Sequence, residues 1–124
     1  MFAQIRAILM DLLDVVEEEI TPERYLVRDL GMESIDFLEL AVALNQRFQV
    51  LVHDDTVFLR NLRLHVMQAR ADGQPVMEGL KAHYAFLSDG RLQAILSDMD
   101  GGPVIQVQDL MDYVRWQMKT AKAA

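Results

Sequence analysis

Apolar residues recur at intervals of three and four along most of this 124-residue chain. That spacing places side chains on one face of an α-helix, whereas a half-buried strand alternates at every second residue. The first such stretch covers residues 2–19 and predicts a helix that ends before Pro22, because a proline ring cannot continue a helical turn. The pattern as a whole predicts an all-α fold.

Further helices are predicted over residues 34–48, 54–72, 76–88 and about 107–120, with a short helical piece near 92–99. Between the first two helices, residues 21–33 read as a loop that closes at Gly31. The expected buried side of the 34–48 helix comprises Leu38, Ala41, Leu44, Asn45 and Phe48. Leu62, Leu64 and Val66 also alternate as in a strand, but a single strand without a partner is not stable, so a helix is preferred. The sequence Ser88-Asp89-Gly90 is expected to end the 76–88 helix.

Length and charge limit what the chain can do. With 52% hydrophobic residues, residues 1–124 are expected to form a single domain with a real core. The net charge is −7, and residues 1–53 hold ten acidic but only four basic residues. Such a chain repels nucleic acid and anionic membranes and attracts basic partners. No basic patch is apparent, and Arg6 and Asp11 interrupt the N-terminal apolar run, so we expect a cytoplasmic monomer without membrane insertion.

The sequence offers no catalytic or metal-binding constellation. There is no cysteine, which excludes disulfides and thiolate metal sites. Met32 and Asp36 stand where a Gly-x-Ser-x-Gly hydrolase motif has its glycines. His53, His65 and His83 are scattered without metal-ligand spacing and are interpreted as surface or packing residues. We therefore expect neither an enzyme nor a metal site.

The most informative stretch runs from Asp29 to Leu40, where a loop, Gly31 and then Ser34 precede an amphipathic helix. Two interpretations of Ser34 are open at this point. Most serines at helix starts are N-caps that accept a backbone hydrogen bond. Alternatively, an exposed hydroxyl at this position could hold a phosphate ester, because the first turn of a helix favours negative charge.

Residues 30–48 resemble the 4′-phosphopantetheine attachment region of acyl carrier proteins. The Asp-Ser-Leu motif of that family appears here as Glu33-Ser34-Ile35, after Leu30-Gly31 and before Asp36, Glu39-Leu40, Leu44 and Phe48. A second block, from Val107 to Val114, looks like the final helix of the family. The resemblance covers roughly residues 1–54 and 104–120.

This resemblance implies a carrier in which Ser34 bears covalent 4′-phosphopantetheine, added from coenzyme A by a Mg²⁺-dependent phosphopantetheinyl transferase. The thiol of that group would hold acyl groups as thioesters for an acyl-ACP synthetase, ketosynthase or acyltransferase with a basic patch. By position, the docking role falls to Glu33, Ile35, Asp36, Glu39 and Val42. The alternatives are a solvated helix face for Asp36 and Glu39 and a core position for Val42. The alternative for the whole chain is an unmodified, carrier-like adaptor that binds protein partners.

The chain departs from the family pattern in three places. Glu33 replaces the usual aspartate but keeps its charge. Asn45-Gln46-Arg47 stand where carriers of general fatty acid biosynthesis are typically acidic, which favours a specialised lipid, lipopolysaccharide or polyketide pathway. An insertion of about residues 55–103 is apolar enough to add two or three helices to the carrier-like helical bundle. We expect it to enlarge the acyl pocket or to dock one dedicated partner.

Overall fold

The computed structural model describes the backbone of residues 1–123 and the side chains of residues 1–120; Ala124, the last residue of the expected domain, lies outside them. Within this part of the chain the regular elements are helices, and no strand forms. The α-helices are α1 (Phe2–Leu13), α2 (Ser34–Phe48), α3 (Asp54–Val57), α4 (Leu62–Ala71), α5 (Val76–His83), α6 (Asp89–Asp98) and α7 (Val107–Ala123). Two 3₁₀ turns are η1 (Glu17–Glu19) and η2 (Met99–Gly101). The all-α prediction is confirmed.

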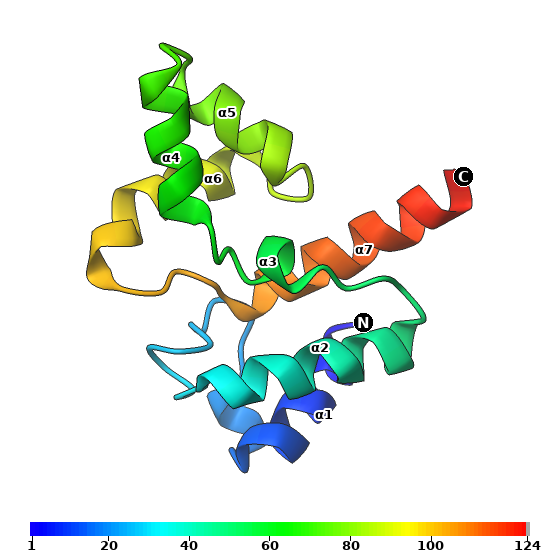
Figure 1. Ribbon diagram of the computed structural model, residues 1–124. Coiled ribbons are helices and arrows are strands. Elements are labelled where there is room, and N and C mark those ends of the chain that lie inside the picture. The colour runs from blue at the N-terminus through cyan, green and yellow to red at the C-terminus, as the bar shows by residue number, and fades with distance from the viewer. Residues whose placement is uncertain (124) are drawn as a thin grey trace.

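The helices form two groups that share one hydrophobic core. Helices α1, α2, α3 and α7 pack together, and α4, α5 and α6 form a second group at the top of Figure 1. Phe86, which follows α5, joins the groups because its ring lies 5.2 Å from the ring of Tyr113 and 6.2 Å from that of Trp116, both on α7. The second group falls in the predicted insertion and supplies the three helices α4, α5 and α6.

The first helix is shorter than predicted. It ends at Leu13, not near Pro22, because Asp14 adopts a left-handed conformation (φ 54°) and donates its N–H to Met10 O. A continued helix would place several acids at its C-terminal end, where the helix dipole disfavours negative charge. The glutamates form η1 instead, and Glu17 pairs with Arg6 at 2.9 Å.

The predictions for residues 54–98 are right in type and wrong in extent. Residues 54–72 are helical but divided into α3 and α4, because Leu59 takes a positive φ of 56°. Helix α5 ends at His83, earlier than predicted. Ser88 then begins α6 as an N-cap, since its Oγ accepts the Arg91 N–H at 3.1 Å, and the expected helix stop is wrong. Helix α2 has the predicted bounds, and α7 begins at the predicted residue.

The loop before α2 is fixed to the segment before α7. Leu26 N–H donates to Ile105 O at 3.0 Å, and Leu26 itself is fully buried. The Arg28 guanidinium donates to both carboxylate oxygens of Asp98 at 3.0 Å and to the carbonyl of Gly102 at 2.9 Å. The loop that precedes Ser34 is therefore held by the end of the insertion.

Candidate functional site

Ser34 is the first residue of α2, and its side chain faces solvent. The N-cap position belongs to Glu33, whose backbone N–H donates to Asp36 Oδ2 at 2.8 Å. No hydrogen bond joins the Ser34 hydroxyl to any residue that the structure describes. The interpretation of Ser34 as an N-cap is therefore wrong. Ser88 provides the contrast, because its hydroxyl does cap a helix.

Local backbone structure explains why Ser34 faces outward. Leu30 and Met32 point into the core and are 8% and 3% exposed. Gly31 between them has a φ of 72°, a left-handed conformation that costs glycine little. Its N–H donates to Val27 O at 3.1 Å, and the Met32 N–H donates to Leu26 O at 3.0 Å. The chain thus enters α2 from a fixed turn, with Ser34 on the outside.

The outer face of α2 carries an exposed apolar stripe. Ile35 is 62% exposed and Val42 is 56% exposed, so the alternative of a core position for Val42 is wrong. Leu38, expected on the buried side, is 55% exposed and lies between them. The buried side is formed by Leu40 and Leu44. A shallow groove runs along this stripe, lined by Leu38, Glu39, Val42, Ala43 and Gln46.

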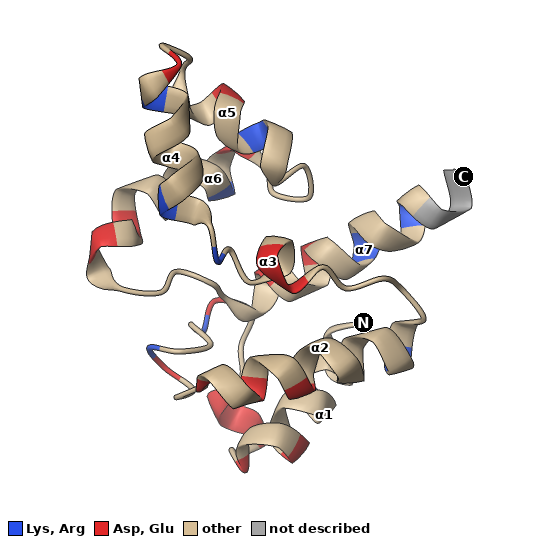
Figure 2. Cartoon of the chain, viewed as in Figure 1, with Lys and Arg blue, Asp and Glu red and all other residues tan. Residues whose placement is uncertain are grey.

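Charge is divided along α2. Figure 2 shows acidic residues over the N-terminal half of α2, with a basic residue near its other end. Glu33 and Glu39 are exposed, whereas Asp36 is half-buried and accepts the Glu33 N–H. Asp36 therefore stabilises the helix start as well as adding negative charge. A partner that approaches Ser34 meets acidic side chains around an apolar stripe.

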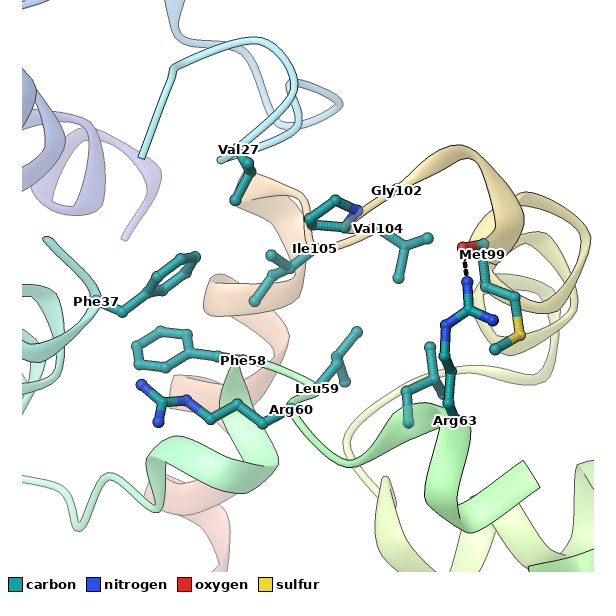
Figure 3. A pocket seen from close by; sticks show the side chains of 12 residues that line it. Val27, Phe37, Phe58, Leu59, Arg60, Arg63, Met99, Gly102, Val104 and Ile105 are labelled. Atoms are coloured by element: carbon teal, nitrogen blue, oxygen red, sulfur yellow. Dashed lines mark hydrogen bonds between the residues drawn. The ribbon is translucent and has the colours of Figure 1, made fainter. Parts of the chain in front are cut away.

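An apolar cavity of about 430 Å³ lies between α2, the turn that joins α3 to α4, the start of α4, and residues 99 and 102–105. Figure 3 shows Phe37 and Phe58 at one side of it, with ring centroids 4.8 Å apart. Further apolar lining comes from the start of α4 and from the loops and turns between the helices: Val27, Leu59, Leu62, Met99, Val104 and Ile105. Phe37 lies three residues after Ser34, and residues at that spacing are neighbours on a helix surface. The volume falls within the range of ligand pockets, roughly 300–1,000 Å³.

Arginines lie on α4 and on the turn before it, in a chain that is acidic overall. Arg60 and Arg63 both line the cavity, and Arg63 and Arg70 line a second groove. The overall negative charge hides these residues, although residues 56–71 contain no acidic residue. Acids from outside this stretch lie beside two of them, because Arg60 is 4.0 Å from Asp54 and Arg63 is 3.7 Å from Asp100.

The histidines are not all scattered in space. The rings of His65 and His83 stack with centroids 3.6 Å apart, and they join α4 to α5. Burial, and then the proximity of His83, lowers the pKa of His65 below its ordinary value. The side chains placed by the structure include no group of three His, Asp or Glu residues that could hold a metal ion. These histidines pack against each other, as one of the expected interpretations has it.

Comparison with known proteins agrees with this geometry. Residues 3–63 match the family model of the phosphopantetheine attachment site. An acyl carrier protein of Nitratidesulfovibrio vulgaris is 42% identical over 52 residues, which cover 42% of this chain and 68% of that protein. An acyl carrier protein of Helicobacter pylori is 36% identical over 55 residues, covering 44% and 70%. The chain therefore belongs to the acyl carrier protein family. No solved structure matches it.

Membership fixes several properties. Acyl carrier proteins are non-catalytic carriers, so the chain is a carrier and not an enzyme. The group it carries is phosphopantetheine, and the family implies a phosphopantetheinyl transferase and acyl-handling enzymes as partners. None of the helices in the described part of the chain is long and apolar enough to cross a membrane. The family match ends at residue 63, so α5, α6 and most of α4 lie beyond it.

Proposed function

We propose that this protein is a specialised acyl carrier in which Ser34 holds 4′-phosphopantetheine. The main support is that the Ser34 hydroxyl faces solvent at the first turn of α2 and does not cap the helix. The backbone N–H groups of that turn and the positive end of the helix dipole would stabilise a phosphodiester at this oxygen. Ser34 also lies inside the matched attachment region.

The chemistry asked of Ser34 is one nucleophilic substitution. Its oxygen forms a bond to the β-phosphorus of coenzyme A, the phosphorus–oxygen bond of the diphosphate breaks, and adenosine 3′,5′-bisphosphate leaves. A base of the transferase accepts the hydroxyl proton. When bound, the arm supplies a thiol that holds acyl groups as thioesters. The protein contributes a fixed attachment point.

We propose that the docking surface is the outer face of α2, formed by Glu33, Ile35, Asp36, Glu39 and Val42 and extended by Leu38. Ile35, Leu38 and Val42 follow the i, i+3, i+7 spacing of one helix face, and each is more than half exposed. The acids beside them attract a basic partner surface and mainly raise its association rate. Asn45-Gln46-Arg47 remove the negative charge further along α2, which supports a dedicated partner over the enzymes of general fatty acid biosynthesis.

We propose further that residues 1–124 form one domain in which the insertion enlarges the acyl pocket. The support is the cavity itself, because its lining combines Phe37 of α2 with Leu62 of α4 and with residues 99 and 102–105. An acyl chain held there would be shielded from water. The proposed setting is the cytoplasm, with coenzyme A as donor, and a specialised lipid, lipopolysaccharide or polyketide pathway as the destination of the cargo.

Intact mass spectrometry tests the attachment. The protein is incubated with coenzyme A, Mg²⁺ and a broad-range phosphopantetheinyl transferase. We expect one phosphopantetheine adduct on the unaltered chain and none on Ser34→Ala. Ser97→Ala is the matched control, because Ser97 is also an exposed helical serine but its hydroxyl donates to Gln93 O at 3.0 Å. An unmodified protein under these conditions would instead support the adaptor function.

The docking surface is tested with the same transferase. Replacing Ile35 with alanine should lower kcat/KM for modification about tenfold, since truncation of an interface anchor typically costs more than 1 kcal/mol. Leu51→Ala is the control, because Leu51 is 70% exposed but lies beyond the end of α2. Equal losses for the two variants would contradict a specific role for the outer face of α2.

A further inference from the structure

The cavity has a feature that storage of a plain alkyl chain does not require. Arg60 and Arg63 contribute to its lining, while the other lining residues carry no charge. A cavity meant only for methylene groups gains nothing from a guanidinium, because apolar burial depends on the area removed from water. The side chains of Arg60 and Arg63 are 43% and 65% exposed, so both stand at the mouth of the cavity, where a polar end of the cargo can meet them.

Arg63 lies at the end of the cavity away from the attachment helix. Figure 3 shows Phe37 and Arg63 on opposite sides of the lining. Because Ser34 and Phe37 are neighbours on the surface of α2, an arm attached at Ser34 brings its thioester to the cavity on the side of Phe37. Its remote end then lies on the side of Arg63, between α4 and Met99.

The Arg63 guanidinium has donors to spare for a ligand. Its Nη2 donates to Met99 O at 3.1 Å, which orients the group. The carboxylate nearest to it belongs to Asp100, 3.7 Å away, and the side chain of Asp100 is 96% exposed. Exposed pairs of this kind contribute little, and a guanidinium has five N–H donors.

We propose that the cargo is an acyl group with a carboxylate or another oxyanion at the end remote from its thioester, and that Arg63 binds that end. This inference rests on the proposed function, because it requires a thioester carried on Ser34. Arg63 stands at the solvent-exposed mouth of the cavity, where its guanidinium can bind a carboxylate through two parallel hydrogen bonds. A methyl end gains nothing from it. Arg63 thus favours an anionic chain end over a methyl end.

The test compares two cargoes of equal length. Octanoyl and suberoyl groups are loaded from their coenzyme A thioesters by the transferase, and intact mass confirms loading. The rate at which hydroxylamine cleaves each thioester then reports shielding, and the Nε–H resonance of Arg63 reports contact. We expect cleavage of the suberoyl thioester to be about fivefold slower than that of the octanoyl thioester, with the resonance shifted only by suberoyl.

Two variants test whether the difference in cleavage rate depends on Arg63. Arg63→Gln should bring the two cleavage rates within about twofold of each other, the octanoyl rate staying unchanged. Arg70→Gln is the matched control, because Arg70 is exposed on the same helix but does not line the cavity, and it should keep the difference. Equal cleavage rates of both thioesters on the unaltered protein overturn the inference. This comparison does not depend on the folding of any variant. Failure to load any group at Ser34 instead refutes the proposed function.

Discussion

The buried ion pair between Arg91 of α6 and Asp109 of α7 should be the strongest single attachment of the inserted helices. Asp109 is fully buried and accepts hydrogen bonds from Arg91 Nε at 2.8 Å, Arg91 Nη2 at 2.9 Å and the Gln106 N–H at 2.8 Å. Arg91 Nη2 also donates to Val104 O at 2.8 Å. Replacing Arg91 with methionine leaves a buried carboxylate with one donor.

The expected loss of unfolding free energy follows from that geometry. Breaking a buried pair by removing one partner costs about 3–5 kcal/mol, against a typical total stability of about 5–15 kcal/mol. Arg91→Met should therefore lose about 3–5 kcal/mol. The double variant Arg91→Met with Asp109→Asn removes both charges and keeps an acceptor for Gln106 N–H, so it should be more stable than Arg91→Met alone.

Urea denaturation measures these values. Trp116 is the only tryptophan and lies 6.2 Å from Phe86, so its fluorescence reports the junction between the two helix groups. Lys81→Met is the control, because the Lys81–Asp89 pair has a similar distance of 2.9 Å but is solvent-exposed and should contribute under about 1 kcal/mol. The reasoning is refuted if Arg91→Met loses no more than Lys81→Met, or if the double variant is the least stable.

Three further substitutions should change the stability of the fold in a stated direction. Gly79→Ala should lower the urea midpoint despite the better helix propensity of alanine, because its Cβ would lie 2.8 Å from the Ala69 Cβ. An unchanged midpoint would contradict the close packing of α4 on α5. Tyr84→Phe should raise the free energy of unfolding by up to about 1 kcal/mol, because the Tyr84 hydroxyl is buried without a hydrogen-bond partner among the described residues. The same burial raises the pKa of Tyr84 to about 12. A clear loss of stability would contradict an unpartnered hydroxyl. The pKa of His65 is lowered in the folded state, so the unfolded chain binds more protons and stability should fall as pH drops through about 6.5. His65→Phe keeps an aromatic ring stacked on His83 and should flatten this pH dependence. Urea midpoints measured at several pH values test it.

Helix α2 was predictable because its signals are local. The acidic residues at its start and the apolar period that continues to Phe48 lie within the helix itself, and the bounds predicted for α2 agree with the structure. The orientation of its faces was not predictable to the same degree. More than half of the helix circumference is apolar, so the sequence alone cannot decide whether Leu38 or Leu40 is buried. The packing of α1 decides it and leaves Leu38 outside.

The errors elsewhere have a different cause. Leu59 takes a positive φ that no local rule predicts for leucine, and this turn divides one predicted helix into α3 and α4. The pairs that join the helix groups link residues distant in sequence, such as Arg28 with Asp98. A net charge counted for each segment of the sequence does not reveal such pairs, because their two members lie in different segments. The residues that line the cavity are likewise distant in sequence, so the sequence did not predict them.

The segment from Asp98 to Asp109 connects the insertion to the site at Ser34. At its start, Asp98 and Gly102 bind Arg28 in the loop that leads to Ser34. At its end, Asp109 binds Arg91. Between these anchors, residues 99 and 102–105 line the cavity. The loop that positions Ser34 and the lining of the cavity therefore contact one fixed stretch of backbone, which Figure 1 shows running between the two helix groups. The insertion between α3 and α7 contributes to a cavity beside α2 because the segment that leads back from it passes there.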